Sequence, residues 1–382
     1  MSSVAKRKNN VLPLHLEVQG ETELSGFLKV SGAKNSSLAL MAAALLTREK
    51  LFIENVPNLT DIDVMSNILS TLGATLTKGS KILEIDASEI FNAELPHKLV
   101  NSLRASFFCI GPLLTRLGEA KIPLPGGCNI GARPVDEHIN GLKALGANVN
   151  ITNDVVTAKI ATHTKRLRGA KITLNYPSVG ATETILMASC LASGTTTIFN
   201  AAKEPEIQDL AEMLNSMGAR IKGAGTERIS IMGVETLKGT SHSVIPDRIE
   251  AGTLLIAAAI TRSTVLVGPV ILSHLNSVIS KLKECGCSII PTGNYLKITP
   301  REIKGVNVIT QPYPGFPTDL QAPFMALMAT AKGSSKIKEK VFENRMQHVS
   351  QLKKMGASIH VSENVALITG VKKLKGANVM GG

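Results

Sequence analysis

Hydrophobic residues along the chain follow two helical patterns that alternate. In the first, nearly every position is apolar, which is typical of a helix buried on all sides. In the second, apolar residues recur every three or four positions, as at Ile62, Met65, Leu69 and Leu72, which predicts an amphipathic helix with one buried face. The strongly apolar stretches are residues 36–46, 105–114, 181–191, 249–260 and 320–331.

Each amphipathic stretch ends at a short motif that recurs about every 70 residues. Its central glycine follows the last apolar position and is a helix stop signal. Two strand-like runs come next, such as residues 74–77 and 82–85 around the turn Lys78-Gly-Ser80. The chain is therefore predicted to repeat a unit of central helix, strand, outer helix and hairpin. The motifs are Leu72-Gly-Ala74, Leu145-Gly-Ala147, Met217-Gly-Ala219, Cys285-Gly-Cys287 and Met355-Gly-Ala357.

The residues at the starts of the central helices are charged or small. A position that faces the core would instead be apolar. If these helix N-termini face one cleft, their dipoles and side chains form an anion-binding site that needs no metal. An ordinary row of solvated helix starts gives the same pattern, and charge alone does not exclude it. The five residues are Lys34, Arg104, Gly180, Arg248 and Asp319.

The repeat is uneven at the two ends of the chain. Residues 14–18 and 27–30 read as strands that precede the first central helix, and the sequence stops at Gly382 before a sixth central helix. We therefore expect an α/β fold of six units in which the sixth is incomplete.

Composition narrows the classes of partner. The chain has 382 residues, 44% of them hydrophobic, so a substantial core is expected, and its net charge of +12 favours acidic ligands. Aromatic residues make up only 3%, without tryptophan, which argues against a nucleic-acid partner that stacks its bases on the protein. The longest apolar run, residues 38–46, is far shorter than the roughly 20 residues that span a membrane. No membrane association and no secretion signal are expected.

The five cysteines have no metal-ligand spacing, so no metal site is predicted. Cys109 and Cys190 lie in apolar helical runs and are expected to be small core residues. An odd number of cysteines without a disulfide framework favours a reducing, cytoplasmic compartment.

Residues 123–134 contain three glycines and three prolines, which predicts a loop. The loop carries Cys128 and Arg133, and a helix is predicted to start at Pro134. A thiol beside a guanidinium and a helix N-terminus is suited to chemistry on an anion. The alternative is an incidental loop cysteine.

Seven stretches together form a recognisable pattern: Ser31-Gly-Ala-Lys-Asn35, Arg104-Ala-Ser106, Pro125-Gly-Gly-Cys-Asn-Ile-Gly-Ala-Arg-Pro-Val-Asp136, Ser178-Val-Gly180, Pro246-Asp-Arg248, Gly315-Phe-Pro-Thr-Asp319 and Phe342-Glu-Asn-Arg345. They resemble the UDP-N-acetylglucosamine enolpyruvyl transferases, and the resemblance runs from about Leu14 to Met380. The related family of 5-enolpyruvylshikimate-3-phosphate synthases lacks the cysteine loop and has Lys-Ser where this chain has Lys34-Asn35.

The resemblance implies a two-lobed, inside-out α/β barrel built from about six βαβαββ units, with central helices inside and sheets outside. One lobe is expected at residues 33–241, with the Cys128 loop. The other is expected at residues 242–382, with Asp319, and the tail and strands of residues 1–32 belong to it. The helix N-termini are expected to face a cleft that closes on substrate.

The reaction implied is transfer of the enolpyruvyl group of phosphoenolpyruvate to the 3-hydroxyl of UDP-N-acetylglucosamine, the first committed step of peptidoglycan synthesis. No metal or organic cofactor is implied. Cys128 is expected to donate the proton, to add covalently to phosphoenolpyruvate and to be alkylated by fosfomycin. Asp319 is expected to be the base, although an N-cap aspartate is the competing interpretation.

The resemblance also implies the substrate contacts. Lys34, Arg104 and Arg133 are expected to neutralise the phosphate and carboxylate groups, and Asn35 to hydrogen-bond the substrate. His138 is expected to support the loop rather than to ionise. The remaining residues expected along the sugar-nucleotide site are Pro134, Val135, Asp136, Glu137, Ser178, Val179, Gly180, Val341 and Arg345.

The family pattern continues beyond Gly382 with an Asp-Leu-Arg helix start and a further arginine. Their absence from this sequence predicts an open edge in the second lobe and severely reduced turnover. Two alternatives stay open: a catalytically silent protein that binds the UDP-sugar, and a basic protein that binds RNA in a strongly salt-dependent way.

Overall fold

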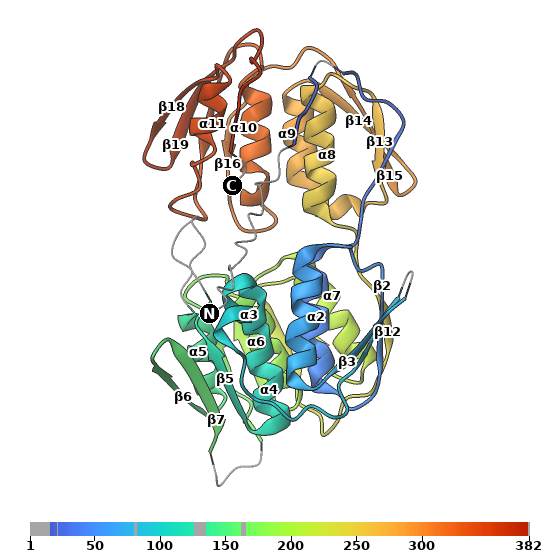
Figure 1. The fold of residues 1–382 in the computed structure, drawn as a ribbon, viewed down its shortest axis with the longest axis vertical. Coiled ribbons are helices and arrows are strands. Elements are labelled where there is room, and N and C mark those ends of the chain that lie inside the picture. The colour runs from blue at the N-terminus through green and yellow to red at the C-terminus, as the bar shows by residue number, and fades with distance from the viewer. Residues whose placement is uncertain (1–15, 21, 80–81, 126–134, 162–165, 381–382) are drawn as a thin grey trace, which may run out of the picture.

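The computed structural model describes residues 16–20, 22–79, 82–125, 135–161 and 166–380. Figure 1 shows two lobes, one above the other. Each has its own hydrophobic core: one runs from Ala33 to Val244, and the other contains Val30 together with residues from Ala251 to Ile368. We call them the first and the second lobe.

The order of elements within each unit is the predicted one: central helix, strand, outer helix and hairpin. The first unit is α1 (Lys34–Ala43, extended by η1, Ala44–Leu46), β2 (Leu51–Glu54), α2 (Thr60–Leu72), β3 (Thr75–Lys78) and β4 (Ile82–Asp86). The second is α3 (His97–Ser102), η2 (Arg104–Cys109), α4 (Ile110–Leu117), β5 (Glu119–Pro123), α5 (Asp136–Ala144), β6 (Ala147–Thr152) and β7 (Val155–Ile160). The third is β8 (Lys171–Thr173), α6 (Val179–Cys190), β9 (Thr195–Phe199), α7 (Pro205–Ser216), β10 (Arg220–Lys222) and β11 (Arg228–Met232).

The second lobe repeats this order twice. Its first unit is α8 (Arg248–Ile260), β13 (Val265–Gly268), η3 (Leu272–Leu275), α9 (Asn276–Glu284), β14 (Cys287–Thr292) and β15 (Tyr295–Pro300). Its second is β16 (Val308–Ile309), η4 (Thr318–Leu320), α10 (Gln321–Met328), β17 (Ser334–Lys338), α11 (Val349–Lys354), β18 (Ser358–Ser362) and β19 (Val365–Thr369).

The chain crosses between the lobes twice, and at each crossing a strand belongs to the lobe that the chain is leaving. Strand β1 (Phe27–Lys29) precedes α1 but pairs in parallel with β13 of the second lobe. Strand β12 (Ser241–Ser243) precedes α8 but pairs with β2 of the first lobe. The two crossing segments also bond to each other, with the Ala33 N–H donating to Ile245 O at 2.8 Å and the Asp247 N–H to Ser31 O at 2.9 Å. The lobes are thus joined by a two-stranded hinge.

The sheets surround the central helices without pairing with one another. Three sheets lie in the first lobe, ordered β12-β2-β4-β3, β5-β7-β6 and β10-β11-β9-β8. Two lie in the second, ordered β1-β13-β15-β14 and β16-β17-β19-β18. Among the residues described, no hydrogen-bonded strand ladder closes, so the barrel expected from the sequence is one of arrangement around the helices and not of strand pairing.

The glycine of every repeat motif has the backbone conformation that the sequence predicted. The φ angles lie between 90° and 111°, a left-handed region in which a side chain is strained. Each glycine therefore ends its outer helix and turns the chain into the hairpin. The residues are Gly73, Gly146, Gly218, Gly286 and Gly356.

Burial of the central helices differs between the lobes. Every residue of α1 from Ser36 onward is buried, as is every residue of α6 from Ala181 onward. In α8, by contrast, Thr253 is exposed and Leu254 is half-buried. One face of α8 is therefore partly open.

Two predictions about element boundaries were wrong. Residues 16–18 form no strand, and Leu16 and Val18 are 87% and 77% exposed, because no neighbouring strand pairs with them; residues 14 and 15 lie outside the described part. The helix predicted from Pro134 begins at Asp136, with Val135 as its N-cap residue.

Cys109 and Cys190 are fully buried, as predicted, and burial raises the pKa of each thiol to about 12. At neutral pH both are protonated and serve as small core residues. Within the described ranges, no helix combines the length and the apolar character that crossing a membrane requires.

Candidate active site

The starts of the central helices lie at the boundary between the lobes. The backbone N–H of Lys34, the first residue of α1, donates to Asp247 Oδ2 at 3.1 Å, and Asp247 is the N-cap residue of α8. The Arg248 guanidinium donates from Nε to Glu206 Oε1 at 3.2 Å, which joins the starts of α8 and α7. Helix N-termini from both lobes are therefore held at one boundary, with the positive ends of their dipoles there.

Lys34 and Asn35 begin α1 and are accessible. Lys34 Nζ forms an ion pair with Asp61 Oδ2 at 3.0 Å, and its side chain is 41% exposed. Asp61 lies in the first turn of α2, and the sequence did not point to it. An anionic ligand that binds Lys34 must compete with Asp61, which makes binding an exchange of partners rather than capture by an unpaired cation.

The cysteine loop connects the strand and the outer helix of the second unit. Its key residues Cys128, Arg133 and Pro134 lie outside the described residues. On either side, β5 ends at Pro123 and α5 begins at Asp136, whose side chain is exposed.

Glu137 is used within the protein. It is only 4% exposed, and its carboxylate accepts from the Asn175 N–H at 3.0 Å and from Asn175 Nδ2 at 2.6 Å. These bonds tie α5 to the segment before α6. The carboxylate of Glu137 is therefore occupied by contacts within the protein.

His138 packs against the start of α6. Its Nδ1 lies 3.0 Å from Thr184 Oγ1, and its ring meets Phe107 edge-on at 5.1 Å. A Cβ at Gly180 lies 3.0 Å from the His138 ring, so a larger residue there is crowded. Ser178 caps α6, its Oγ accepting from the Ala181 N–H at 3.3 Å.

Burial, with a smaller contribution from Arg104, lowers the pKa of His138 to about 3. Its imidazole is therefore neutral near pH 7, in line with a supporting role.

This pKa predicts a pH-dependent stability. Between pH 6.5 and about 3 the unfolded chain binds a proton at His138 that the folded chain does not, so the free energy of unfolding falls as pH falls. We expect the slope of this free energy between pH 6.5 and 5 to be lower in His138→Asn by about 1 kcal/mol per pH unit. Urea titrations at each pH measure it, with the exposed His97→Asn as control. An unchanged slope in His138→Asn contradicts the burial of a neutral imidazole.

Asp319 and Arg345 form an ion pair in the second lobe. Asp319 lies in η4, and its Oδ1 accepts from Arg345 Nη2 at 2.6 Å. The Asp319 side chain is 43% exposed, and among the described residues Oδ2 has no hydrogen-bond partner. The Asp319 carboxylate is therefore held by Arg345 at Oδ1 and remains partly exposed to solvent.

Arg248 connects this pair to a buried group of acids in the first lobe. Burial by itself lowers the pKa of Arg248, but the carboxylates of Glu206, Glu204 and Asp319 together outweigh it and raise that pKa. The Tyr313 N–H donates to Glu204 Oε1 at 3.2 Å, and Arg248 lies over the Tyr313 ring at 5.5 Å. Arg248 and the Tyr313 amide of the second lobe therefore bind the acids Glu206 and Glu204 of the first.

Behind these acids Glu183, in the middle of α6, is 1% exposed. Burial, then Glu206 and Glu204, raise the pKa of Glu183 well above its ordinary value. The helix start at Arg248 was predicted from the sequence, but these carboxylates were not. A signal was available for two of them: Glu204-Pro-Glu206 is a helix start with proline at the first position.

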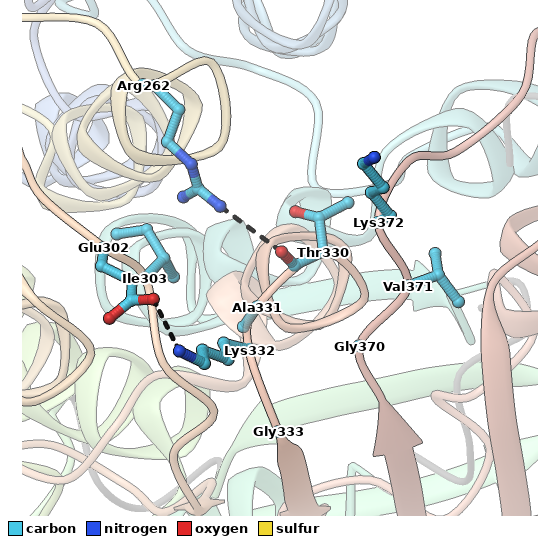
Figure 2. A pocket seen from close by; sticks show the side chains of 10 residues that line it. All are labelled: Arg262, Glu302, Ile303, Thr330, Ala331, Lys332, Gly333, Gly370, Val371 and Lys372. Carbon is cyan, nitrogen blue, oxygen red and sulfur yellow. Dashed lines mark hydrogen bonds and ion pairs between the residues drawn. The ribbon is translucent and has the colours of Figure 1, made fainter.

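A cavity of about 390 Å³ lies elsewhere in the second lobe. Figure 2 shows Arg262, which donates to Thr330 O at 3.4 Å, and the Lys332–Glu302 ion pair at 3.0 Å. Arg262 follows the C-terminal end of α8, and Thr330 and Lys332 follow that of α10. Arg248 and Asp319 lie at the opposite ends of these central helices, about 20 Å away for a 13-residue helix. The cavity is thus separate from the candidate site.

No group of three or more His, Cys, Asp or Glu side chains in the described ranges is arranged to hold a metal ion. The charged groups near the lobe boundary include the ion pairs Lys34–Asp61 and Arg248–Glu206. Such a boundary is suited to binding an anion and to moving a proton.

Comparisons with known proteins place the chain in a family. The model for EPSP synthase (3-phosphoshikimate 1-carboxyvinyltransferase) matches residues 18–381. The enolpyruvyl transferase NikO from Streptomyces tendae has a TM-score of 0.82 at 24% identity, with 92% of this chain and 83% of that chain covered. EPSP synthase from Acinetobacter baumannii has a TM-score of 0.68 at 20% identity, with 93% and 84% covered. These structures share the two-lobed enolpyruvyl transferase fold.

Relatives of higher identity narrow the assignment. UDP-N-acetylglucosamine 1-carboxyvinyltransferase of Prochlorococcus marinus strain NATL2A is 74% identical over 383 residues, covering 100% of this chain and 84% of that protein. The protein of the same description from Synechococcus sp. strain CC9605 is 58% identical over 382 residues, covering 100% and 88%. The chain therefore belongs to the enolpyruvyl transferases, and within them to the UDP-N-acetylglucosamine 1-carboxyvinyltransferase family.

Proposed function

We propose that this protein transfers the enolpyruvyl group of phosphoenolpyruvate to the 3-hydroxyl of UDP-N-acetylglucosamine and releases phosphate. This is the first committed step of peptidoglycan synthesis. The observation that carries the proposal is the 74% identity over the whole chain to a UDP-N-acetylglucosamine 1-carboxyvinyltransferase. The free thiols of Cys109, Cys190, Cys285 and Cys287 fit a reaction in the reducing cytoplasm.

The reaction requires an acid and a base on two substrates. In the addition step the methylene carbon of phosphoenolpyruvate gains a proton, the sugar hydroxyl loses one, and its oxygen bonds to C2. In the elimination step the methyl carbon loses a proton as the bond from C2 to the phosphate oxygen breaks, which restores the double bond. We assign Cys128 as the acid and Asp319 as the base.

The partial exposure of the Asp319 side chain supports its assignment as the base. Arg345, on Oδ1, keeps the carboxylate in place while the hydroxyl approaches from the other side. Cys128 and Asp319 belong to different lobes, so the two-stranded hinge would bring them to one substrate pair when the lobes close.

The cations at the boundary support binding of the two anionic substrates. We assign Lys34, Arg104 and Arg133 to the phosphate and carboxylate groups, and Lys34 leaves Asp61 to do so. The residues that we assign to the sugar nucleotide are Asn35, Pro134, Val135, Asp136, Glu137, Ser178, Val179, Gly180, Asp319, Val341 and Arg345.

Phosphate release tests the proposal. With both substrates present we expect release of phosphate at a rate that depends on UDP-N-acetylglucosamine and is absent with phosphoenolpyruvate alone. Binding of the UDP-sugar without phosphate release identifies a catalytically silent binding protein. Salt-dependent RNA binding, with neither UDP-sugar binding nor phosphate release, identifies an RNA-binding protein.

Fosfomycin tests the acid. The Cys128 thiol should open the epoxide to form one covalent adduct per chain, and the UDP-sugar should accelerate this reaction. Peptide mass spectrometry identifies the modified cysteine. Cys287, buried in β14, is the comparison thiol. An adduct at another cysteine, or none with the UDP-sugar present, contradicts the assignment of Cys128.

A further inference from the structure

Glu339 is a buried carboxylate that follows the end of β17. It is 1% exposed, and no ion pair involves it among the residues that the structure describes. An ionised carboxylate taken from water is costly unless hydrogen bonds replace its hydration. Glu339 therefore depends on its donors.

Those donors come from the residues that follow Glu339 and from two other segments. Oε1 accepts from Thr310 Oγ1 at 2.6 Å, from the Val341 N–H at 2.8 Å and from the Phe342 N–H at 3.2 Å. Oε2 accepts from Thr318 Oγ1 at 2.9 Å. Hydrogen bonds to a charged acceptor are stronger than neutral ones, so this group fixes all three segments.

The topology explains why the segments meet. Strands β16 and β17 pair in parallel, with Ile309 opposite Lys338, so Thr310 and Glu339 leave the same end of the sheet. The Thr310 hydroxyl also accepts from the Lys340 N–H at 2.9 Å, which locks the turn after β17. In open α/β sheets, ligands bind beyond the carboxyl ends of parallel strands.

Two of the three segments, the start of η4 and the residues after Glu339, carry residues that we assign to the reaction. Thr318 is the first residue of η4 and directly precedes Asp319. On the other side, Val341 and Phe342 begin the segment that ends at Arg345, and Arg345 holds Asp319 and lies over the Phe342 ring at 5.4 Å. The carboxylate of Glu339 thus positions both the start of η4, which carries Asp319, and the segment that carries Arg345.

Resting on the proposed function, we propose that Glu339 is a positioning residue: it fixes Asp319 through Thr318, and it fixes the Val341–Arg345 segment through two backbone amides. Glu339 touches no reacting atom in this role. Loss of the Thr318 contact should affect the chemical step, and loss of the amide contacts should affect binding of the sugar nucleotide as well.

Two substitutions at Thr318 isolate the first contact. Thr318→Val keeps the shape and removes the hydroxyl, whereas Thr318→Ser keeps the hydroxyl. We expect Thr318→Val to lower kcat about 10-fold with the KM for UDP-N-acetylglucosamine within about 2-fold of the starting value, and Thr318→Ser to restore kcat. A Thr318→Val variant with unchanged kcat overturns the proposal, as does a Thr318→Ser variant no better than Thr318→Val.

Two substitutions at Glu339 test the whole group. The amide of Glu339→Gln can accept from the backbone and from Thr310 while donating to Thr318, so kcat and KM should stay within a few-fold. Glu339→Met removes every acceptor and should lower kcat about 100-fold and raise KM several-fold. The control is Glu212→Gln on the exposed face of α7, far from the segments that Glu339 contacts, with kcat and KM unchanged. Equal kcat and KM in Glu339→Met and Glu339→Gln overturn the proposal.

Hydrogen exchange makes the test independent of turnover. Read by mass spectrometry without ligand, exchange across residues 340–345 should be faster in Glu339→Met than in the starting protein and unchanged in Glu339→Gln. Equal exchange in all three overturns the positioning role. The three proteins can show this difference in exchange even if the starting protein releases no phosphate. In that case the proposed function fails, and the placement of the segment by Glu339 stands.

Discussion

Asp319→Asn is expected to lower kcat about 10³-fold, because the amide cannot take the proton of the sugar hydroxyl. The substitution keeps the size of the side chain, and the amide oxygen can still accept from Arg345. The KM for UDP-N-acetylglucosamine should therefore change by no more than a few-fold. Steady-state phosphate release at saturating phosphoenolpyruvate measures both constants.

Asp63→Asn is the matched control. Asp63 lies in the first turn of α2 with a side chain that is 62% exposed, and its partner Lys78 is also on the surface. We expect kcat to be unchanged in this variant. A kcat for Asp319→Asn within 10-fold of the starting value means that another group takes the proton.

Arg248→Met is expected to destabilise the protein by about 3–5 kcal/mol, because it leaves Glu206 without its cation. The side chains of Arg248 and Glu206 are 12% and 6% exposed, so water replaces little of the lost interaction. Glu204 beside it has a buried oxygen that has no hydrogen-bond partner among the described residues. Urea unfolding at pH 7 measures the change.

A double-mutant cycle tests the cause. Combining Arg248→Met with Glu206→Gln removes the unpaired carboxylate, so the double variant should lose at least about 1 kcal/mol less than the sum of the single variants. The exposed Arg301→Met is the control and should stay within about 0.5 kcal/mol. Additive losses show that Arg248 stabilises through packing on Tyr313 instead.

These two effects have one structural origin. Arg248 starts the first central helix of the second lobe, and Asp319 lies at the start of the next. The cross-lobe pair of Arg248 and Glu206 is therefore built on the same helix ends that we assign to the reaction.

The sequence by itself determined the repeat. Nearly unbroken apolar stretches predicted helices surrounded by protein, and the glycines after the amphipathic stretches predicted where the outer helices end. Both are local consequences of chain chemistry: an apolar face must be buried, and glycine takes a left-handed conformation without strain. The helix starts at Lys34, Arg104 and Arg248 were predicted because a charged residue precedes each apolar stretch.

The tertiary structure decided which groups act on one another. Strand β1 pairs with β13 and β12 with β2 because the hinge crosses between the lobes, and no periodicity along the chain records that exchange. Lys34 meets Asp61, Arg248 meets Glu206, and Glu339 collects donors from Thr310 and Thr318. A carboxylate reads the same in sequence whether it is solvated or buried. Its partners are set by strands and helices that are distant in the chain and packed side by side.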